Sequence, residues 1–138
     1  MVTHISTLNC CGVKAPSPER IVPLLEVPEG HPEVDIYVIN LQQIVLKGAL
    51  SLFSNNPEEK RTTAWINALK DALYRANVAT KYPSFVLMTS SVGKGCFTGL
   101  FVRQSVMEKV TDYKEGPSVS LATGKGGDRC SKRGSVSI

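Results

Sequence analysis

The segment at residues 35–41 constrains the fold more than any other part of the chain. It reads Asp-Ile-Tyr-Val-Ile-Asn-Leu, so its apolar residues are nearly continuous where a half-exposed strand would alternate apolar with polar. A run of this length is typical of a strand buried on both faces. Such a strand needs a core around it, and 138 residues are enough to bury one.

Residues 57–77 predict one long helix. Asn56 suits the N-cap, Pro57 the first helical position, and Glu59 completes a capping-box pattern. One helix face is apolar and is interpreted as core packing, with Trp65 as an anchor: Trp65, Ile66, Leu69, Leu73 and Ala76. The charged residues are expected to face outward: Lys60, Arg61, Lys70 and Asp71.

Shorter elements surround this helix. Strands are predicted at residues 4–10, 84–89, 96–103, 110–113 and 118–123. A short helix is predicted at residues 19–26, where Pro23 limits its length, and a helical turn at residues 105–109. Residues 134–138 alternate as a strand does, and the sequence stops inside this element.

The positive charge of the chain is unevenly distributed. The formal net charge is +4, and residues 123–138 alone carry Lys125, Arg129, Lys132 and Arg133 against Asp128, together with four glycines. A basic, glycine-rich loop can bring backbone N–H groups and cations to a phosphate. The alternative is a solvated tail that only aids solubility. Because the rest of the chain is nearly neutral, nucleic-acid binding is not expected.

Several classes of protein are excluded at this stage. No apolar run approaches the roughly 18 residues that would suggest a membrane span. The first residues do not have the pattern of a signal peptide. The four cysteines, Cys10, Cys11, Cys96 and Cys130, include no CxxC pair, so a zinc site of the usual spacing is not expected. We interpret them as reduced thiols of a cytoplasmic protein.

Three segments carry a resemblance to a known family. Residues 7–12 read T-L-N-C-C-G, residues 35–45 read D-I-Y-V-I-N-L-Q-Q-I-V, and residues 123–138 run from T-G to a closing S-K-R-G-S-V-S-I. In order and spacing they resemble the inositol polyphosphate 5-phosphatases of the endonuclease/exonuclease/phosphatase superfamily. That family typically shows T-W-N-V-N-G or T-Y-N-V-G-G, then D-I-Y-V-I-G-L-Q-E-I-V, then T-G and G-N-K-G-S-V-S-I.

The resemblance implies an α/β fold, namely part of a two-sheet sandwich flanked by helices. It covers nearly the whole chain but only about the first half of the family's catalytic domain. Residues 1–138 are therefore interpreted as a truncated domain of this type. Half of such a sandwich leaves a sheet edge and part of a sheet face uncovered, which invites a protein partner.

The family is thought to remove the 5-phosphate of inositol phosphates or phosphoinositides with Mg²⁺. By resemblance, Asn9 matches the first Asn of the opening motif, which supports the metal and phosphate network, and Cys11 stands where many members have a second Asn. Gln43 stands where the family has its metal-binding Glu, and a neutral amide should hold Mg²⁺ far less tightly than a carboxylate. An alternative for Asn9 and Gln42 is that they are buried polar side chains bonded to neighbouring strands.

The phosphate loop is also altered. Cys130 and Ser131 stand where the family has Gly and Asn, and Arg133 resembles one inserted residue, while Lys132 is kept. We expect Lys132, Arg133 and Arg129 to be the residues that could attract a phosphate.

The family's later motifs, which supply its histidines, its general base and further metal ligands, do not occur in this sequence. We therefore expect a degenerate, truncated relative, a pseudoenzyme that does not hydrolyse substrate on its own. Three alternatives stay open. The chain could be a phosphatase whose remaining sequence lies elsewhere, a binding module for an inositol phosphate or acidic lipid headgroup, or a structural interaction protein. A location in the cytoplasm follows from the absence of a targeting pattern, and headgroup binding would add the membrane surface.

Overall fold

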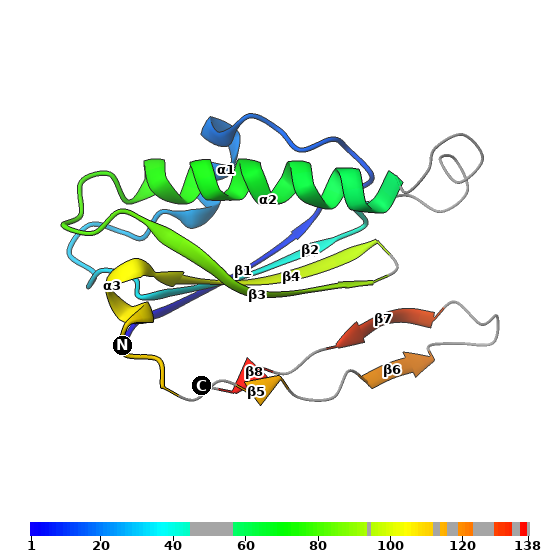
Figure 1. Cartoon of the computed structure of the whole chain (residues 1–138). Coiled ribbons are helices and arrows are strands. Elements are labelled where there is room, and N and C mark those ends of the chain that lie inside the picture. The colour runs from blue at the N-terminus through cyan, green and yellow to red at the C-terminus, as the bar shows by residue number, and fades with distance from the viewer. Residues whose placement is uncertain are drawn as a thin grey trace.

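The apolar segment forms strand β2 (Ile36–Gln42), which lies inside a four-stranded sheet in the computed structural model of the chain. β1 (Thr3–Asn9) pairs with β2 in parallel over its whole length. On the other side β4 (Cys96–Arg103) pairs antiparallel with β2, and β3 (Phe85–Gly93) pairs antiparallel with β4. The sheet order is β1-β2-β4-β3, so β1 and β3 form its edges (Figure 1).

The structure describes residues 1–44, 57–93, 95–111, 114–115, 119–122, 129–133 and 136–137. The predicted N-cap, Asn56, lies outside these ranges. Within them, none of the helices is both long enough and apolar enough to cross a membrane.

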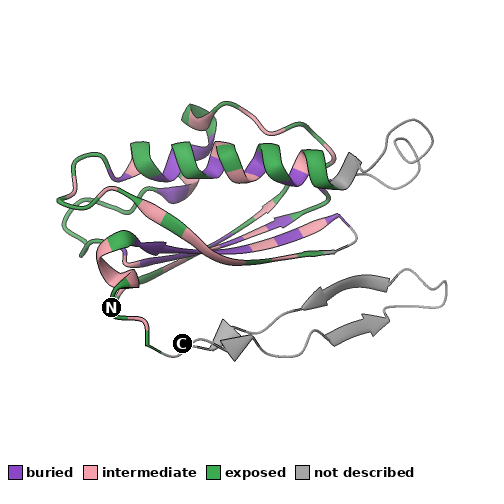
Figure 2. Cartoon of the chain, in the orientation of Figure 1, coloured by how far each residue is buried: buried purple, intermediate pink, exposed green. Residues whose placement is uncertain are grey.

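Two helices cover one face of the sheet (Figure 1). α1 (Pro18–Leu25) connects the parallel strands β1 and β2, and α2 (Pro57–Ala76) precedes β3. The buried side of α2 faces the sheet (Figure 2). The main core between helices and sheet includes Ile21, Leu25, Tyr37, Ile39, Leu41, Trp65, Leu69, Leu73, Phe97 and Phe101. Each large apolar side chain buried there contributes roughly 1.5–3 kcal/mol to folding.

The other face of the sheet carries a smaller apolar cluster. Ile36, Leu100 and Val102 are buried on it, and the short helix α3 (Gln104–Met107) packs its Val106 and Met107 against them. Because alternate residues of a strand point to opposite faces, β2 is covered on both sides over its first half.

Four short strands form two antiparallel pairs apart from the main sheet. β5 (Lys114–Glu115) pairs with β8 (Val136–Ser137), and β6 (Val119–Ala122) pairs with β7 (Arg129–Arg133). β7 approaches the edge strand β3, with Cα atoms of the two strands within 8 Å of each other.

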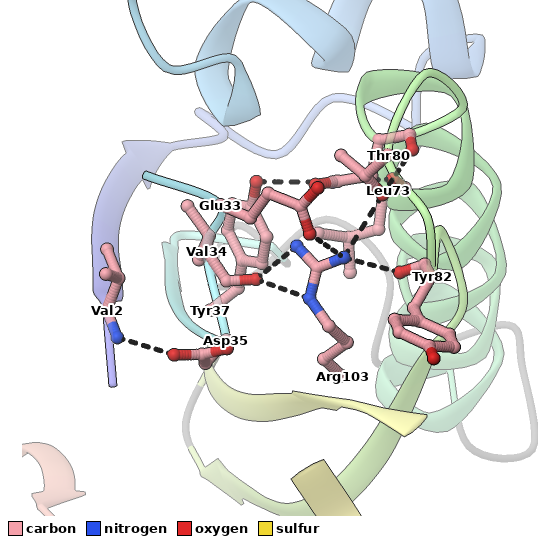
Figure 3. Close-up of polar contacts among 10 residues, drawn as sticks. Val2, Glu33, Val34, Asp35, Tyr37, Leu73, Thr80, Tyr82 and Arg103 are labelled. Atoms are coloured by element: carbon pink, nitrogen blue, oxygen red, sulfur yellow. Dashed lines mark hydrogen bonds and ion pairs between the residues drawn. The ribbon is translucent and has the colours of Figure 1, made fainter. Parts of the chain in front are cut away.

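Arg103 joins several segments at the end of the sheet where β2 begins (Figure 3). Its Nε and Nη2 donate to the carbonyl of Val34 at 2.9 and 2.6 Å, and its Nη1 donates to the carbonyl of Tyr82 at 2.6 Å. Nη1 also donates to Thr80 Oγ1 at 3.1 Å and lies 3.2 Å from a carboxylate oxygen of Glu33. The side chain is only 2% exposed, so this buried cation is satisfied mainly by backbone carbonyls.

The predicted α/β fold class is confirmed, and so is the predicted order of the early elements. Trp65, Leu69 and Leu73 lie in the core as expected. Three predictions differ from the structure. β3 extends to Gly93 instead of ending at residue 89. Residues 110 and 111 are not in a strand, and the next pairing begins at Lys114. Residues 129–133, predicted as part of a basic loop, form β7 instead, because pairing with β6 overrides their loop-like composition.

Candidate functional site

The residues at which β1 and β2 end lie side by side, because Asn9 is the register partner of Gln42. Two backbone bonds extend the pairing beyond the strands, from the Cys10 N–H to the Gln42 carbonyl and from the Gly12 N–H to the Gln43 carbonyl, both 2.7 Å. Cys11 and Gln43 have φ of 47° and 53°, and neither is a glycine. Such conformations cost energy and are kept only where the surrounding contacts hold them.

Asn9 is exposed, and its side chain serves the turn that follows it. Its Oδ1 accepts a hydrogen bond from the Cys11 N–H at 3.0 Å, and the Cys11 thiol donates to the same oxygen at 3.5 Å. Gln42 and Gln43 are exposed as well. The alternative that Asn9 and Gln42 are buried polar side chains is therefore wrong.

Arg61 of α2 also reaches this end of the sheet. Its Nη1 donates to the carbonyl of Gly12 and, at 3.3 Å, to the carbonyl of Ile44. The prediction that Arg61 faces outward is wrong, whereas Lys60 is exposed as expected. The signal was present in the sequence, since Arg61 lies four residues before Trp65 and therefore shares its helix face.

The two adjacent thiols have different surroundings. Cys10 is 2% exposed and belongs to the main core, while Cys11 is exposed. Burial, and then the charge of the neighbouring Cys11, raise the pKa of Cys10 to about 11. Cys10 is therefore a protonated thiol at neutral pH, which makes it a poor nucleophile and a poor metal ligand.

The side chains gathered at this end do not fit Mg²⁺. Asn9, Gln42 and Gln43 offer only neutral amide oxygens, and nearby Asn40 accepts a hydrogen bond from Thr98 Oγ1 at 2.9 Å. In the part of the chain that the structure describes, no group of three or more His, Cys, Asp or Glu could hold a metal ion. A hard divalent cation prefers carboxylate oxygens, so no step through a metal can be assigned to these residues. We call residues 9–12 and 42–44 the neutral end of the sheet.

The basic candidates lie elsewhere in the fold. Arg129, Lys132 and Arg133 all belong to β7, where Lys132 is paired with Ser120 and Arg133 with Val119. β7 lies within a two-stranded sheet separate from the one that carries Asn9 and Gln43. The structure thus brings Asn9 and Gln43 to one end of the main sheet and groups the three cations on another strand.

The fold defines a class. A four-stranded mixed sheet with two helices on one face, together with the short strand pairs, fits part of an α/β sandwich.

One solved structure illustrates this class. The chain is similar to the inositol polyphosphate 5-phosphatase domain of spsynaptojanin, a crystal structure in complex with inositol (1,4)-bisphosphate and calcium ion. The TM-score is 0.63 at 24% sequence identity, which demonstrates likeness of fold. The similarity covers 92% of this chain and 33% of that one, so the chain spans about a third of the other's length. No protein-family model matches the sequence, and neither does any curated protein.

Proposed function

We propose that this chain is a phosphatase-related domain that does not hydrolyse phosphate esters on its own and instead binds a phosphorylated headgroup of the inositol phosphate class. The likeness of its fold to a domain crystallised with inositol (1,4)-bisphosphate supports the ligand class. Headgroup binding would bring a cytoplasmic protein to the membrane surface.

The proposed lack of hydrolysis rests on the residues at the neutral end of the sheet. Phosphoryl transfer needs cations where negative charge develops and a base that activates water. At the corresponding position Gln43 supplies an uncharged amide, and Asn9 directs its oxygen to the Cys11 N–H. The nearby Cys10 thiol stays protonated at neutral pH and cannot act as the base.

The basic strand β7 supports headgroup binding. Arg129, Lys132 and Arg133 fall within five residues of one strand, so three positive charges lie close together along the chain. Phosphate groups are bound by arginine forks and lysine point charges, and losing one such contact typically weakens binding by about tenfold.

Titration of the chain with inositol (1,4)-bisphosphate, followed by calorimetry, tests the binding. We expect Lys132→Ala and Arg133→Ala each to weaken affinity by roughly five- to twentyfold. The matched control is Lys70→Ala, which removes the same charge from the exposed face of α2 and should leave affinity unchanged. Equal affinity for the native chain and both β7 variants would contradict headgroup binding by β7.

A phosphate-release assay with Mg²⁺ tests the lack of hydrolysis separately. We expect no turnover by the native chain on soluble or lipid substrates. Gln43→Glu restores the missing carboxylate, and this variant should bind Mg²⁺ more tightly than the native chain, as measured by calorimetry with the metal alone. Turnover by the native chain at a rate typical of enzymes would show that the neutral end is a working site.

A further inference from the structure

The two edges of the main sheet differ in how they are protected. β3 carries a register irregularity between Leu87 and Thr89, and β7 approaches it to within 8 Å. β1 pairs with β2 in an unbroken register, and no described strand pairs on its other side. An exposed, regular edge strand is a template for pairing with another strand.

The backbone of β1 shows which groups are free. The Val2 carbonyl accepts from the Ile36 N–H at 3.1 Å, and the Cys10 N–H donates to the Gln42 carbonyl at 2.7 Å. Even-numbered residues of β1 therefore bond to β2. In a parallel ladder the alternate residues direct their N–H and C=O groups the other way. Four residues thus present backbone donors and acceptors at the open edge: Thr3, Ile5, Thr7 and Asn9.

The side chains of β1 do not guard this edge. The same four residues are exposed, and Ile5 is 68% exposed. Residues 3–9 contain no proline, lysine, arginine or acidic residue, which are the usual protections of an edge strand. The one titratable side chain, His4, is directed to the helix layer, where its Nε2 lies 2.7 Å from Ser6 Oγ and 3.1 Å from the carbonyl of Leu24.

We propose that β1 is a dimerisation edge, at which it pairs antiparallel with β1 of a second copy of the chain. A two-fold axis through Ile5 places Ile5 opposite Ile5 and Thr3 opposite Thr7. All of these residues direct their backbone groups outward, so each pair can exchange two hydrogen bonds, about six in total. The result is one continuous eight-stranded sheet.

Charge and side-chain chemistry favour a second copy over other strands. The chain carries a net charge of +4, but β1 itself is uncharged at its open face, so pairing it with itself brings no like charges together locally. β-branched residues and threonine pairs are favourable partners across strands. This proposal is independent of the proposed function.

Sedimentation equilibrium over a series of concentrations tests the proposal on the full chain. We expect the mass to rise from 15.0 kDa towards twice that value, reversibly, because an interface of one strand is small. Ile5→Lys places like charges opposite each other and should hold the chain at the monomer mass. Val86→Lys is the matched control, because it introduces the same charge at a 41% exposed apolar residue on the other edge strand and should leave the dimer intact.

Cross-linking provides a second measurement that does not depend on the lysine variant. Residues paired across the two-fold axis lie within reach of a disulfide, so Ile5→Cys should form a covalent dimer under mild oxidation with glutathione disulfide. The native chain controls for its exposed thiol, Cys11, and Val86→Cys controls for chance encounters. A monomer at every concentration, or a dimer that Ile5→Lys leaves intact, would overturn the proposal. If the chain is monomeric, a strand of another protein becomes the alternative partner of the β1 edge.

Discussion

Two arginines bind the backbone at opposite ends of the central strands, and they differ in burial and in hydrogen-bond partners. Arg103 lies where β2 begins, is 2% exposed and binds two backbone carbonyls, a hydroxyl and a carboxylate. Arg61 lies where β2 ends, is half-buried and binds two carbonyls of the turns that follow β1 and β2. Both use guanidinium groups to join segments distant in sequence.

This difference distinguishes the end of the sheet that stabilises the fold from the end that is a candidate site. At the Arg103 end the guanidinium N–H groups are hydrogen-bonded to other parts of the chain, so few donors are left for a ligand. At the neutral end Arg61 holds the backbone of the turns, while Asn9, Cys11 and Gln43 stay exposed. Side chains that serve a ligand need this combination of a fixed backbone and accessible groups, and it occurs where the parallel strands end.

Removing Arg103 should have the largest effect on stability. We expect Arg103→Ala to lower the free energy of unfolding by about 3–5 kcal/mol, because the Val34 and Tyr82 carbonyls lose their donor and the buried stem leaves a void. Urea denaturation measures the change. Arg75→Ala is the control, since its ion pair with Glu19 is exposed on both sides and should contribute little to stability. Equal losses for the two variants would remove the contrast between a buried and a surface cation.

The buried thiol at the neutral end predicts a pH effect of intermediate size. The pKa of Cys10 is raised from its ordinary value of 9.0 to about 11. A raised pKa means that folding favours the protonated thiol, so this contribution is complete below pH 9 and is lost as the pH rises through 11. Over that range we expect the free energy of unfolding to fall by about 2–3 kcal/mol on account of Cys10.

Cys10→Ala isolates this contribution, because burial also raises the pKa of Tyr37 and its effect stays in the variant. Urea denaturation at several pH values should give a shallower loss of stability for Cys10→Ala than for the native chain. Identical slopes would show that Cys10 is not held as a thiol by its surroundings.

Removing Arg61 should have the smallest effect of the three. We expect Arg61→Ala to lower the free energy of unfolding by about 1–2 kcal/mol, because a half-buried cation gives up two carbonyls that water can partly reach. Faster hydrogen exchange of the Gly12 amide, which bonds to the Gln43 carbonyl, would locate the loss at the neutral end. Lys60→Ala, on the exposed face of the same helix, should change stability by no more than about 0.5 kcal/mol. A loss as large as that of Arg103→Ala would make the two ends equivalent.

Local sequence was a good guide wherever one element supplies its own signal. The alternation of strand and helix, the apolar stripe of α2 and the short helix around Pro23 all follow from spacing within a few residues. β7 was missed because its arginines, lysine and flanking glycines resemble a loop, and only its pairing with β6, more than five residues away in sequence, makes it a strand. The charge of Arg61 predicts an outward side chain, whereas its spacing from Trp65 predicts a place on the buried helix face, and the structure follows the spacing.

The properties of the candidate site also fall into two groups, those that the sequence determines and those that depend on the tertiary structure. The sequence by itself determined the residue types: amides at positions 9, 42 and 43, thiols at 10 and 11, and three cations between 129 and 133. Only the tertiary structure decided that the Asn9 oxygen serves the Cys11 N–H, that burial keeps Cys10 protonated, and that the cations lie on a strand apart from the neutral end. The physical reason is that residue type is a property of the chain, whereas burial and hydrogen-bond partners depend on which distant segments fold beside it.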